Sequence, residues 1–359
     1  MTGMKKRVFS GTRATGRLHL GNYFGAIKGY IDLQNQADLD CLYMVVDLHS
    51  ITTPFTPKTL RSYTKEVVLD YLGTGLDPNK STITLQSMVP EHTYLSWLFS
   101  SMISIARLQH LPTFKEKVKL HPENVNLALL SYPVFMAADI LTYQAHLVPV
   151  GIDQEPHLEL AREIAHKINQ RFNTNFPEPQ RYASTINSVP SLTGDGKMSK
   201  SVERSTIFLT DSHEQIRKKI AAISTNSGKG AIKKRRQSGK NITQYYNENG
   251  VLTPGLTTLF EFVELFQGKV MRVQYDSSYK KEGVRFGDIK NSLASSIYDE
   301  LRPIQERRAY FSQYESQVNQ ILINGAKNAR EIAGNTLSIM QQAYGFYQPV
   351  NVGNVQKIL

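Results

Sequence analysis

The sequence predicts an α/β fold, in which a doubly wound parallel sheet forms a first domain and an all-helical second domain follows. Three observations support this prediction. The chain has 359 residues, more than one ordinary domain requires. In its first half, short apolar runs alternate with longer amphipathic segments, as when crossover helices join parallel strands. After about Arg204 the strand signals fade, while helical periodicity continues.

The individual elements follow from the spacing of apolar residues. In the first half we expect strands at residues 8–10, 41–47, 82–86 and 147–150, and helices near 22–34, 57–72 and 157–171. In the second half we expect helices at 214–223, 256–266 and 289–301, and then over 304–344 with interruptions at Gly325 and Gly334. We therefore predict three parts: a sheet domain over residues 1–203, a helical domain over 204–301, and C-terminal helices over 302–359 that pack back toward the sheet domain.

Composition narrows the possible classes of protein. Apolar residues make up 40% of the chain and charged residues 20%, as in a compact globular protein and unlike a disordered or fibrous one. Cys41 is the only cysteine, which excludes an intramolecular disulfide and a cysteine-rich metal site and fits a reducing cytosol. The longest apolar run, residues 127–141, contains Asp139 and is shorter than the ~18 residues that span a bilayer. The first expected strand begins too early for a signal or transit peptide, so we expect a cytoplasmic protein.

The chain is basic, because 42 Lys and Arg outnumber 31 Asp and Glu and give a formal charge of +11. This charge favours a polyanionic partner or an anionic substrate, although it does not identify one. Residues 228–240 are rich in Gly, Lys, Arg and Ser and predict a mobile basic loop. The loop contains the run Lys233, Lys234, Arg235 and Arg236. A solvated surface and a contact with RNA explain this run equally well.

The first chemical motif lies between the first expected strand and helix. Residues 10–22 are Ser-Gly-Thr-Arg-Ala-Thr-Gly-Arg-Leu-His-Leu-Gly-Asn. Glycines let the backbone approach a ligand closely, and a helix N-terminus presents unpaired N–H groups to an anion, so this segment predicts a phosphate site. Thr15 and His19 can donate hydrogen bonds to phosphate oxygens. Taken alone, His19 is better explained as a helix cap or a core residue.

The second motif is Gly-Lys-Met-Ser-Lys-Ser at residues 196–201, next to Gly194 and Asp195 in a segment that predicts a flexible loop. Lys197 and Lys200 flank a small turn. Such a loop can close over a triphosphate and stabilise the charge that develops on leaving pyrophosphate. An exposed Lys/Ser loop is the alternative, but five specified residues match by chance only on the order of once in ten thousand sequences.

Together, the two motifs resemble the paired signatures of class I aminoacyl-tRNA synthetases. Further segments resemble the tryptophanyl members of bacterial type, and they lie at residues 46–52, 114–117, 132–141, 148–154 and 301–307. The resemblance thus covers most of the chain. It implies a Rossmann-like catalytic domain, a helical domain that binds the tRNA anticodon, ATP with Mg²⁺ on its phosphates, and L-tryptophan and tRNA(Trp) as substrates. It also implies a homodimer, with neither a membrane nor DNA as a partner.

Asp139 is the residue that points to tryptophan as the amino acid. A buried indole has one N–H donor, which stays unsatisfied unless an acceptor lies at the floor of the pocket, and Asp139 can be that acceptor. Tyrosyl enzymes typically carry Gln at the position of Met136, whereas an apolar side chain suits indole better. Met136 and Ile140 as plain core residues, with Asp139 as a helix cap, form the less favoured alternative once the resemblance is counted.

The resemblance also implies roles for other residues. Tyr132 and Gln154 would hold the polar end of tryptophan, with His49 nearby. Contacts to ATP would come from Arg13, Ala14, Thr15, Gly21, Asn22, Gly151, Ile152, Asp153, Val189, Lys197, Met198, Ser199, Lys200 and Ser201. Catalysis would involve Lys197, Lys200, His19, Thr15 and Lys117, the last as a phosphate contact. No protein-bound metal is expected. Members of the family commonly have Gln-Pro-Ser at positions 13–15 and Glu at 152, so the ATP contacts of this chain differ in detail.

Three rival functions share part of this pattern. A tyrosyl enzyme shares the chemistry but not the apolar Met136. A small nucleotidyltransferase shares the early histidine motif, but it needs neither a helical second domain nor a tryptophan-type pocket. An RNA-binding paralogue without activity is disfavoured because Lys197 and Lys200 are both present. Amino-acid-dependent pyrophosphate exchange distinguishes these possibilities.

Overall fold

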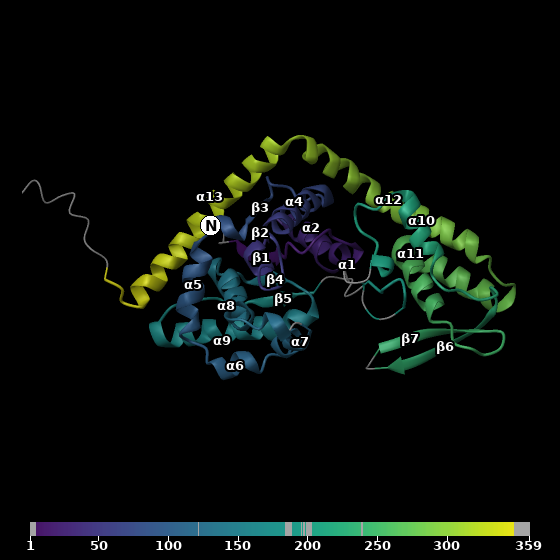
Figure 1. Cartoon of the computed structure of the whole chain (residues 1–359), viewed down its shortest axis with the longest axis horizontal. Coiled ribbons are helices and arrows are strands. Elements are labelled where there is room, and N and C mark those ends of the chain that lie inside the picture. The colour runs from purple at the N-terminus through teal and green to yellow at the C-terminus, as the bar shows by residue number, and fades with distance from the viewer. Residues whose placement is uncertain are drawn as a thin grey trace, which may run out of the picture.

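The computed structural model describes residues 5–120, 122–183, 189–194, 196, 198, 203–237 and 240–347. Its centre is a five-stranded parallel sheet with the strand order β3-β2-β1-β4-β5 (Figure 1). The strands are β1 (Lys6–Thr12), β2 (Leu39–Val45), β3 (Ser81–Leu85), β4 (Leu147–Pro149) and β5 (Gln180–Tyr182). The predicted α/β class is confirmed, and β5 is a strand that the sequence did not indicate.

The strand order reverses direction between β1 and β4. The chain starts at β1, moves outward through β2 to β3, and then returns to pair β4 with the free edge of β1, where Val8 lies opposite Leu147. In open α/β sheets, a ligand binds at the carboxyl ends of the strands that flank such a reversal. The segments that follow β1 and β4 are therefore the expected walls of a site, and residues 13–19 and 150–154 occupy them.

Helices cover both faces of the sheet. In this part of the chain they are α1 (Leu20–Asn22), a π-helical turn (Tyr23–Ile27), α2 (Lys28–Gln34), α3 (Asp47–Ser50), α4 (Pro57–Thr74), α5 (Glu91–Ser100), α6 (Ile105–Gln109), α7 (Pro112–Leu120), α8 (Leu127–Thr142) and α9 (Glu155–Phe172). Short 3₁₀ turns lie at Gln86–Met88, Pro122–Asn124, Ile152–Gln154 and Glu203–Ser205. Neighbouring strand residues point to opposite faces, so Val8 joins the core under α2 and α4, and Phe9 joins the core under α5, α8 and α9. Burial on both faces explains the continuous apolar run in β2, whose residues 41–45 are all buried, whereas β1 and β3 also contain polar residues.

The region after residue 203 is mainly helical, with α10 (His213–Ala221), α11 (Pro254–Lys281), α12 (Phe286–Gln313) and α13 (Glu315–Ala343). It also contains an antiparallel hairpin of β6 (Gly230–Gln237) and β7 (Lys240–Asn247), which corrects the predicted loop over 228–240. The hairpin is held by Tyr245, which is fully buried and stacks on Phe260 of α11 with ring centroids 4.9 Å apart. Charged residues along β6 concealed its alternation, and its apolar anchor lies on the partner strand.

The two last helices meet at an angle at Tyr314 and reach back over the sheet domain (Figure 1). Neither predicted interruption occurs, because α13 continues through Gly325 and Gly334. Gly325 has a packing role: a Cβ there would lie 2.1 Å from the carbonyl oxygen of Ile83, so α13 lies directly against β3. Helix α12 passes through residues 301 and 302 without a break, and the division into three parts at 203 and 301 stays a prediction. Among the described residues, no helix has the length and apolarity needed to cross a membrane.

Candidate active site

A cavity of about 410 Å³ lies at the carboxyl ends of β1 and β4, at the reversal of strand order. Helices α7 and α8 contribute the opposite wall. Many of the residues that the sequence predicted for the site line this cavity: Arg13, Thr15, Asn22, His49, Lys117, Tyr132, Met136, Asp139, Gly151 and Gln154. The fold thus brings together side chains that are up to about 140 positions apart in the sequence.

Other predicted residues do not form the cavity wall. Ala14, Val189 and Met198 are buried and Gly21 is partly buried, Asp153 accepts a hydrogen bond from Gln154, and Ile152 is largely exposed. His19 is buried and caps α1, with its Nδ1 accepting the N–H of Gly21 at 3.0 Å. This is the capping position that the sequence alone favoured for His19. Four predicted residues of the second motif lie outside the described residues, namely Lys197, Ser199, Lys200 and Ser201.

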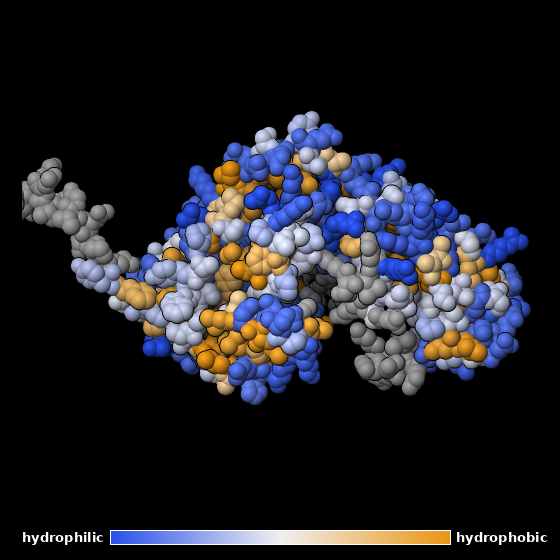
Figure 2. Space-filling view, viewed as in Figure 1, coloured by the Kyte–Doolittle hydropathy of each residue, from blue (hydrophilic) through white to orange (hydrophobic). Residues whose placement is uncertain are grey.

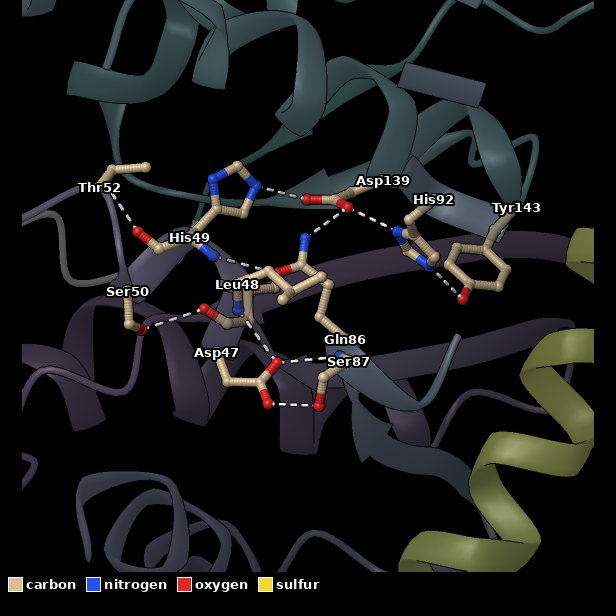
Figure 3. Close-up of polar contacts among 11 residues, drawn as sticks. Asp47, Leu48, His49, Ser50, Thr52, Gln86, Ser87, His92, Asp139 and Tyr143 are labelled. Atoms are coloured by element: carbon tan, nitrogen blue, oxygen red, sulfur yellow. Dashed lines mark hydrogen bonds and ion pairs between the residues drawn. The ribbon is translucent and has the colours of Figure 1, made fainter. Parts of the chain in front are cut away.

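Asp139 lies at the floor of the cavity, fully enclosed, and three side chains donate to its carboxylate (Figure 3). His49 Nε2 is 2.7 Å from Oδ2, while Gln86 Nε2 and His92 Nδ1 are 2.7 Å and 2.5 Å from Oδ1. The orientation of His92 is fixed in turn, because its Nε2 pairs with the hydroxyl of Tyr143 at 2.7 Å. The carboxylate therefore has one defined position in the pocket.

The electrostatics of this network keep Asp139 ionised. Burial by itself raises the pKa of the carboxyl, but the charge and hydrogen bond of His49 and the hydrogen bond of His92 outweigh burial and lower the pKa to about 2. Oδ1 accepts two hydrogen bonds and Oδ2 accepts one, so Oδ2 has capacity for a further donor. Met136 and Ile140, on the same helix, add apolar surface to this end of the cavity.

The cavity also carries two cations, Arg13 and Lys117, that have no acidic partner among the described residues, and we call the part around them its cationic end. The guanidinium of Arg13 donates to Thr53 Oγ1 at 3.0 Å and weakly to Thr52 Oγ1 at 3.4 Å, while its buried Nε finds no hydrogen-bond partner in the part of the chain that the structure describes. Lys117 Nζ lies 4.0 Å from the ring centre of Tyr132. Burial lowers the pKa of Lys117, and the charge of Arg13 lowers it further, to about 8. This end is therefore suited to an anion.

A third polar group of the cavity is the imidazole of His157. His157 Nε2 contacts the hydroxyl of Tyr132 at 3.0 Å and that of Thr113 at 3.1 Å. Burial, followed by the charge of Lys117, lowers the pKa of His157 to about 4, so the imidazole is neutral at pH 7. The contact orients Tyr132 at the cavity wall.

Comparison with known proteins identifies the family. Residues 2–298 match the family described as tRNA synthetases class I (W and Y). The tryptophan–tRNA ligase of Porphyromonas gingivalis is 35% identical over 342 residues, which are 94% of this chain and 99% of that protein. The corresponding enzyme of Clostridium acetobutylicum is 36% identical over 351 residues, 96% of this chain and 98% of the relative. The chain belongs to the tryptophanyl-tRNA synthetases.

Solved structures agree with this assignment. The tryptophanyl-tRNA synthetase of Mycoplasma pneumoniae superposes with a TM-score of 0.79 at 32% identity, covering 96% of this chain and 99% of the other. The enzyme of Campylobacter jejuni, solved in complex with ADP and tryptophan, superposes with a TM-score of 0.78 at 29% identity, covering 95% and 100%. Both confirm the fold and the family that the two motifs indicated.

In this tryptophanyl-tRNA synthetase, the structure adds site residues that the sequence did not single out: Gln86, His92, Thr113 and His157. Gln86 comes directly after β3, at its carboxyl end, which is the edge of the sheet that holds the site, and His92 follows in the first turn of α5. The position of Gln86 is the signal that could have revealed it. His92, Thr113 and His157 carry no such signal, since each lies within the first turns of an ordinary helix.

Proposed function

We propose that this synthetase joins L-tryptophan to tRNA(Trp) in two steps. In the first, a carboxylate oxygen of tryptophan attacks the α-phosphorus of ATP, the bond to the bridging oxygen breaks, and pyrophosphate leaves. In the second, a hydroxyl of the tRNA acceptor end attacks the carbonyl carbon and releases AMP. Mg²⁺ enters as part of the substrate, bound to the ATP phosphates. Neither step needs a protein nucleophile, because positioning and charge stabilisation supply the acceleration.

The observation that carries this proposal is the ionised carboxylate of Asp139 at the apolar floor of the cavity. We propose that its Oδ2 accepts the indole N–H, while Met136 and Ile140 pack against the ring. His49 and Gln86 hold the acceptor in place, so the donor of a buried indole is satisfied without reorganisation. Tyr132 and Gln154 lie further along the same wall, where they would hold the ammonium and carboxylate groups of the amino acid.

ATP would extend from the middle of the cavity to its cationic end. Arg13, Lys117, Thr15 and Asn22 face that end and are our candidates for the phosphate contacts. Gly151, Ile152, Asp153 and Val189 would contact the ribose and adenine. Ala14 and Gly21 would contact ATP through their small surfaces, since their backbone N–H groups already donate to Ser50 Oγ and His19 Nδ1, and His19 would hold the helix turn in place. The second motif, Lys197 to Ser201, would cover the leaving pyrophosphate.

A homodimer and a tRNA-binding surface complete the proposal. Hydrophobic side chains gather on the surface over α6, α8 and α9 (Figure 2). Ile105 of α6 and Leu127 of α8 are 64% and 76% exposed, and Trp97 of the neighbouring helix α5 is 78% exposed. Burying such side chains against a second copy would remove a large apolar area from water.

For tRNA, the exposed Lys233 and Lys234 of β6 offer positive charge. Charged tRNA is used in translation, so we expect the cytoplasm as the compartment.

Pyrophosphate exchange measured with each of the twenty amino acids tests the proposed reaction. We expect exchange that depends on tryptophan, with tyrosine and phenylalanine far weaker, followed by charging of tRNA(Trp). Stronger exchange with tyrosine would overturn the assignment of the pocket, and no exchange with any amino acid would favour the inactive paralogue. Sedimentation velocity of the parent and of Trp97→Glu tests the dimer, since the charged variant should shift toward the monomer.

A further inference from the structure

Helix α12 is connected to the first motif through a buried carboxylate. Asp70 of α4 is fully buried, and both of its oxygens are used. Its Oδ2 accepts the backbone N–H of Leu18 at 3.1 Å, and its Oδ1 accepts Nε of Arg308 at 2.8 Å. Arg308 lies on α12, and Leu18 directly precedes His19. The carboxylate of Asp70 therefore joins α12 to the loop that carries the first motif.

The same helix reaches the chain that follows the second motif. The side-chain amide of Gln305, one turn before Arg308, donates to the carbonyl oxygens of Leu209 and Asp211, both at 2.9 Å. The backbone N–H of Leu209 donates in turn to the carbonyl oxygen of Leu18 at 3.0 Å. These contacts form a closed ring that runs from Gln305 through Leu209, Leu18 and Asp70 to Arg308 and back along α12. We call it the α12 ring.

Stability alone does not explain this arrangement. Burial raises the pKa of Asp70 to about 6, against the opposing charge of Arg308, so the carboxylate is costly to keep ionised at this position. A buried ion pair contributes little net stability, because desolvation offsets much of the attraction. A second contact holds the same helices together without Asp70, since Arg307 Nε donates to the carbonyl oxygen of Gly73 at 2.7 Å. What Asp70 and Gln305 add is a fixed spacing between two backbone segments.

We propose that Asp70, Gln305 and Arg308 are positioning residues for adenylate formation, because the α12 ring holds the segment of the first motif at a set distance from the segment that leads away from the second. The inference rests on the proposed function, in which the two motifs act on the same triphosphate. Phosphoryl transfer is sensitive to such spacing, and a misplacement of about 1 Å can cost roughly a hundredfold in rate. Tryptophan would bind at Asp139, whose hydrogen bonds go to His49, Gln86 and His92 and not to the ring, so the affinity for tryptophan should be independent of the ring.

The test compares Gln305→Leu, Asp70→Asn and Arg308→Lys with the matched control Arg307→Ala. Arg307 connects the same two helices but lies outside the ring, so its variant reports on helix packing alone. For the ring variants we expect the single-turnover rate of adenylate formation to fall roughly ten- to a hundredfold, with the Kd for tryptophan within about twofold of the parent. For Arg307→Ala we expect a rate close to that of the parent. Equal slowing by Arg307→Ala and Gln305→Leu would overturn the proposal.

Non-additivity provides a second readout that a purely structural role would not produce. Once one contact opens the ring, breaking another should add little, so Gln305→Leu combined with Arg308→Lys should be nearly as fast as the slower single variant. Multiplied effects would mean that the contacts act independently and would refute the ring.

Gln305 is uncharged and only half-buried, which keeps the test valid if Asp70→Asn fails to fold. Absent tryptophan-dependent exchange in the parent would refute the proposed function, whereas normal exchange in both the parent and Gln305→Leu would refute only the ring.

Discussion

Replacing Arg13 with the Gln that is common in the family should weaken the binding of ATP. The guanidinium makes one strong and one weak hydrogen bond, to Thr53 and Thr52, and its buried Nε has no hydrogen-bond partner among the described residues. It therefore keeps donors and a full charge available at the cationic end of the cavity. The Gln amide in Arg13→Gln can still reach a threonine hydroxyl, but it brings no charge to a phosphate.

The size of the effect follows from these contacts. A charge-assisted hydrogen bond contributes about 1.5–3 kcal/mol, and about 1.4 kcal/mol corresponds to a factor of ten. We therefore expect KM for ATP to rise roughly ten- to a hundredfold at pH 7. The rise in KM for ATP depends on pH, because the pKa of Lys117 is about 8 and the side chain loses its proton as the pH rises through 8. Removing Arg13 raises the pKa of Lys117, so the variant keeps its remaining cation to higher pH, and the ratio of the two KM values should shrink toward pH 9.

The assay is pyrophosphate exchange at saturating tryptophan, with ATP and Mg²⁺ titrated separately between pH 6.5 and pH 9. The variant should also need more Mg²⁺ for half-maximal activity, since the metal neutralises the same phosphates. Arg17→Gln is the matched control, because Arg17 lies in the same loop but stacks over Phe208 at 4.2 Å and does not line the cavity. The Kd for tryptophan without ATP should be unchanged in both variants. Overlapping ATP titrations of the parent and Arg13→Gln would refute a phosphate contact.

Three further predictions test the rest of the site. Asp139→Ala should lower kcat/KM for tryptophan much more than for ATP, because the indole N–H loses an acceptor worth roughly 1–3 kcal/mol. Discrimination against phenylalanine should fall as well. An unchanged kcat/KM for tryptophan would disprove the pocket assignment. Lys197→Ala or Lys200→Ala should slow activation by roughly 10²–10³ with tryptophan affinity nearly intact, which stopped-flow measurements check, and parental rates in both would remove these lysines from catalysis. Neutralising the basic run at 233–236 should weaken tRNA binding and flatten its salt dependence while adenylate formation continues, and a parental salt slope would leave the run as solvated surface.

Much of the sheet could be predicted from the sequence, because β1 to β4 each contain buried apolar residues, most clearly β2, where Cys41 to Val45 form an unbroken buried run. β5 could not, since its residues Gln180–Tyr182 are polar or partly exposed and leave no apolar pattern. The hairpin was missed for a related reason: Lys233, Lys234 and their neighbours conceal the alternation, and Tyr245 anchors it from the other strand. The spacing of apolar residues along the sequence indicates which residues are buried. It does not record the strand pairing and the ring contacts that hold β5 and the hairpin in place.

In the site, too, some properties can be predicted from one short segment, whereas others depend on residues that are far away in the sequence. Asp139 and Met136 could be assigned from one helical segment, but the charge state of Asp139 depends on His49 and His92, which lie 90 and 47 positions away. The anionic preference of the cationic end likewise depends on Lys117 and Arg13 lining one cavity, where no described residue gives either of them an acidic partner.

The α12 ring shows why such properties escape a sequence even when every motif is found. Both motifs and the segment at 301–307 could be recognised, but recognition gives residue types and an order along the chain. The ring closes through two backbone groups of Leu18, whose side chain has no part in it, and through Asp70, which belongs to no motif. A backbone N–H that must be paired can be satisfied by many side chains, so only the packing of α12 on α4 selects Asp70 for this one. The proposed spacing of the two motifs is therefore set by the α12 ring, and changes at Asp70, Gln305 or Arg308 should alter catalysis without touching a substrate, whereas Arg307→Ala at the same packing surface should not.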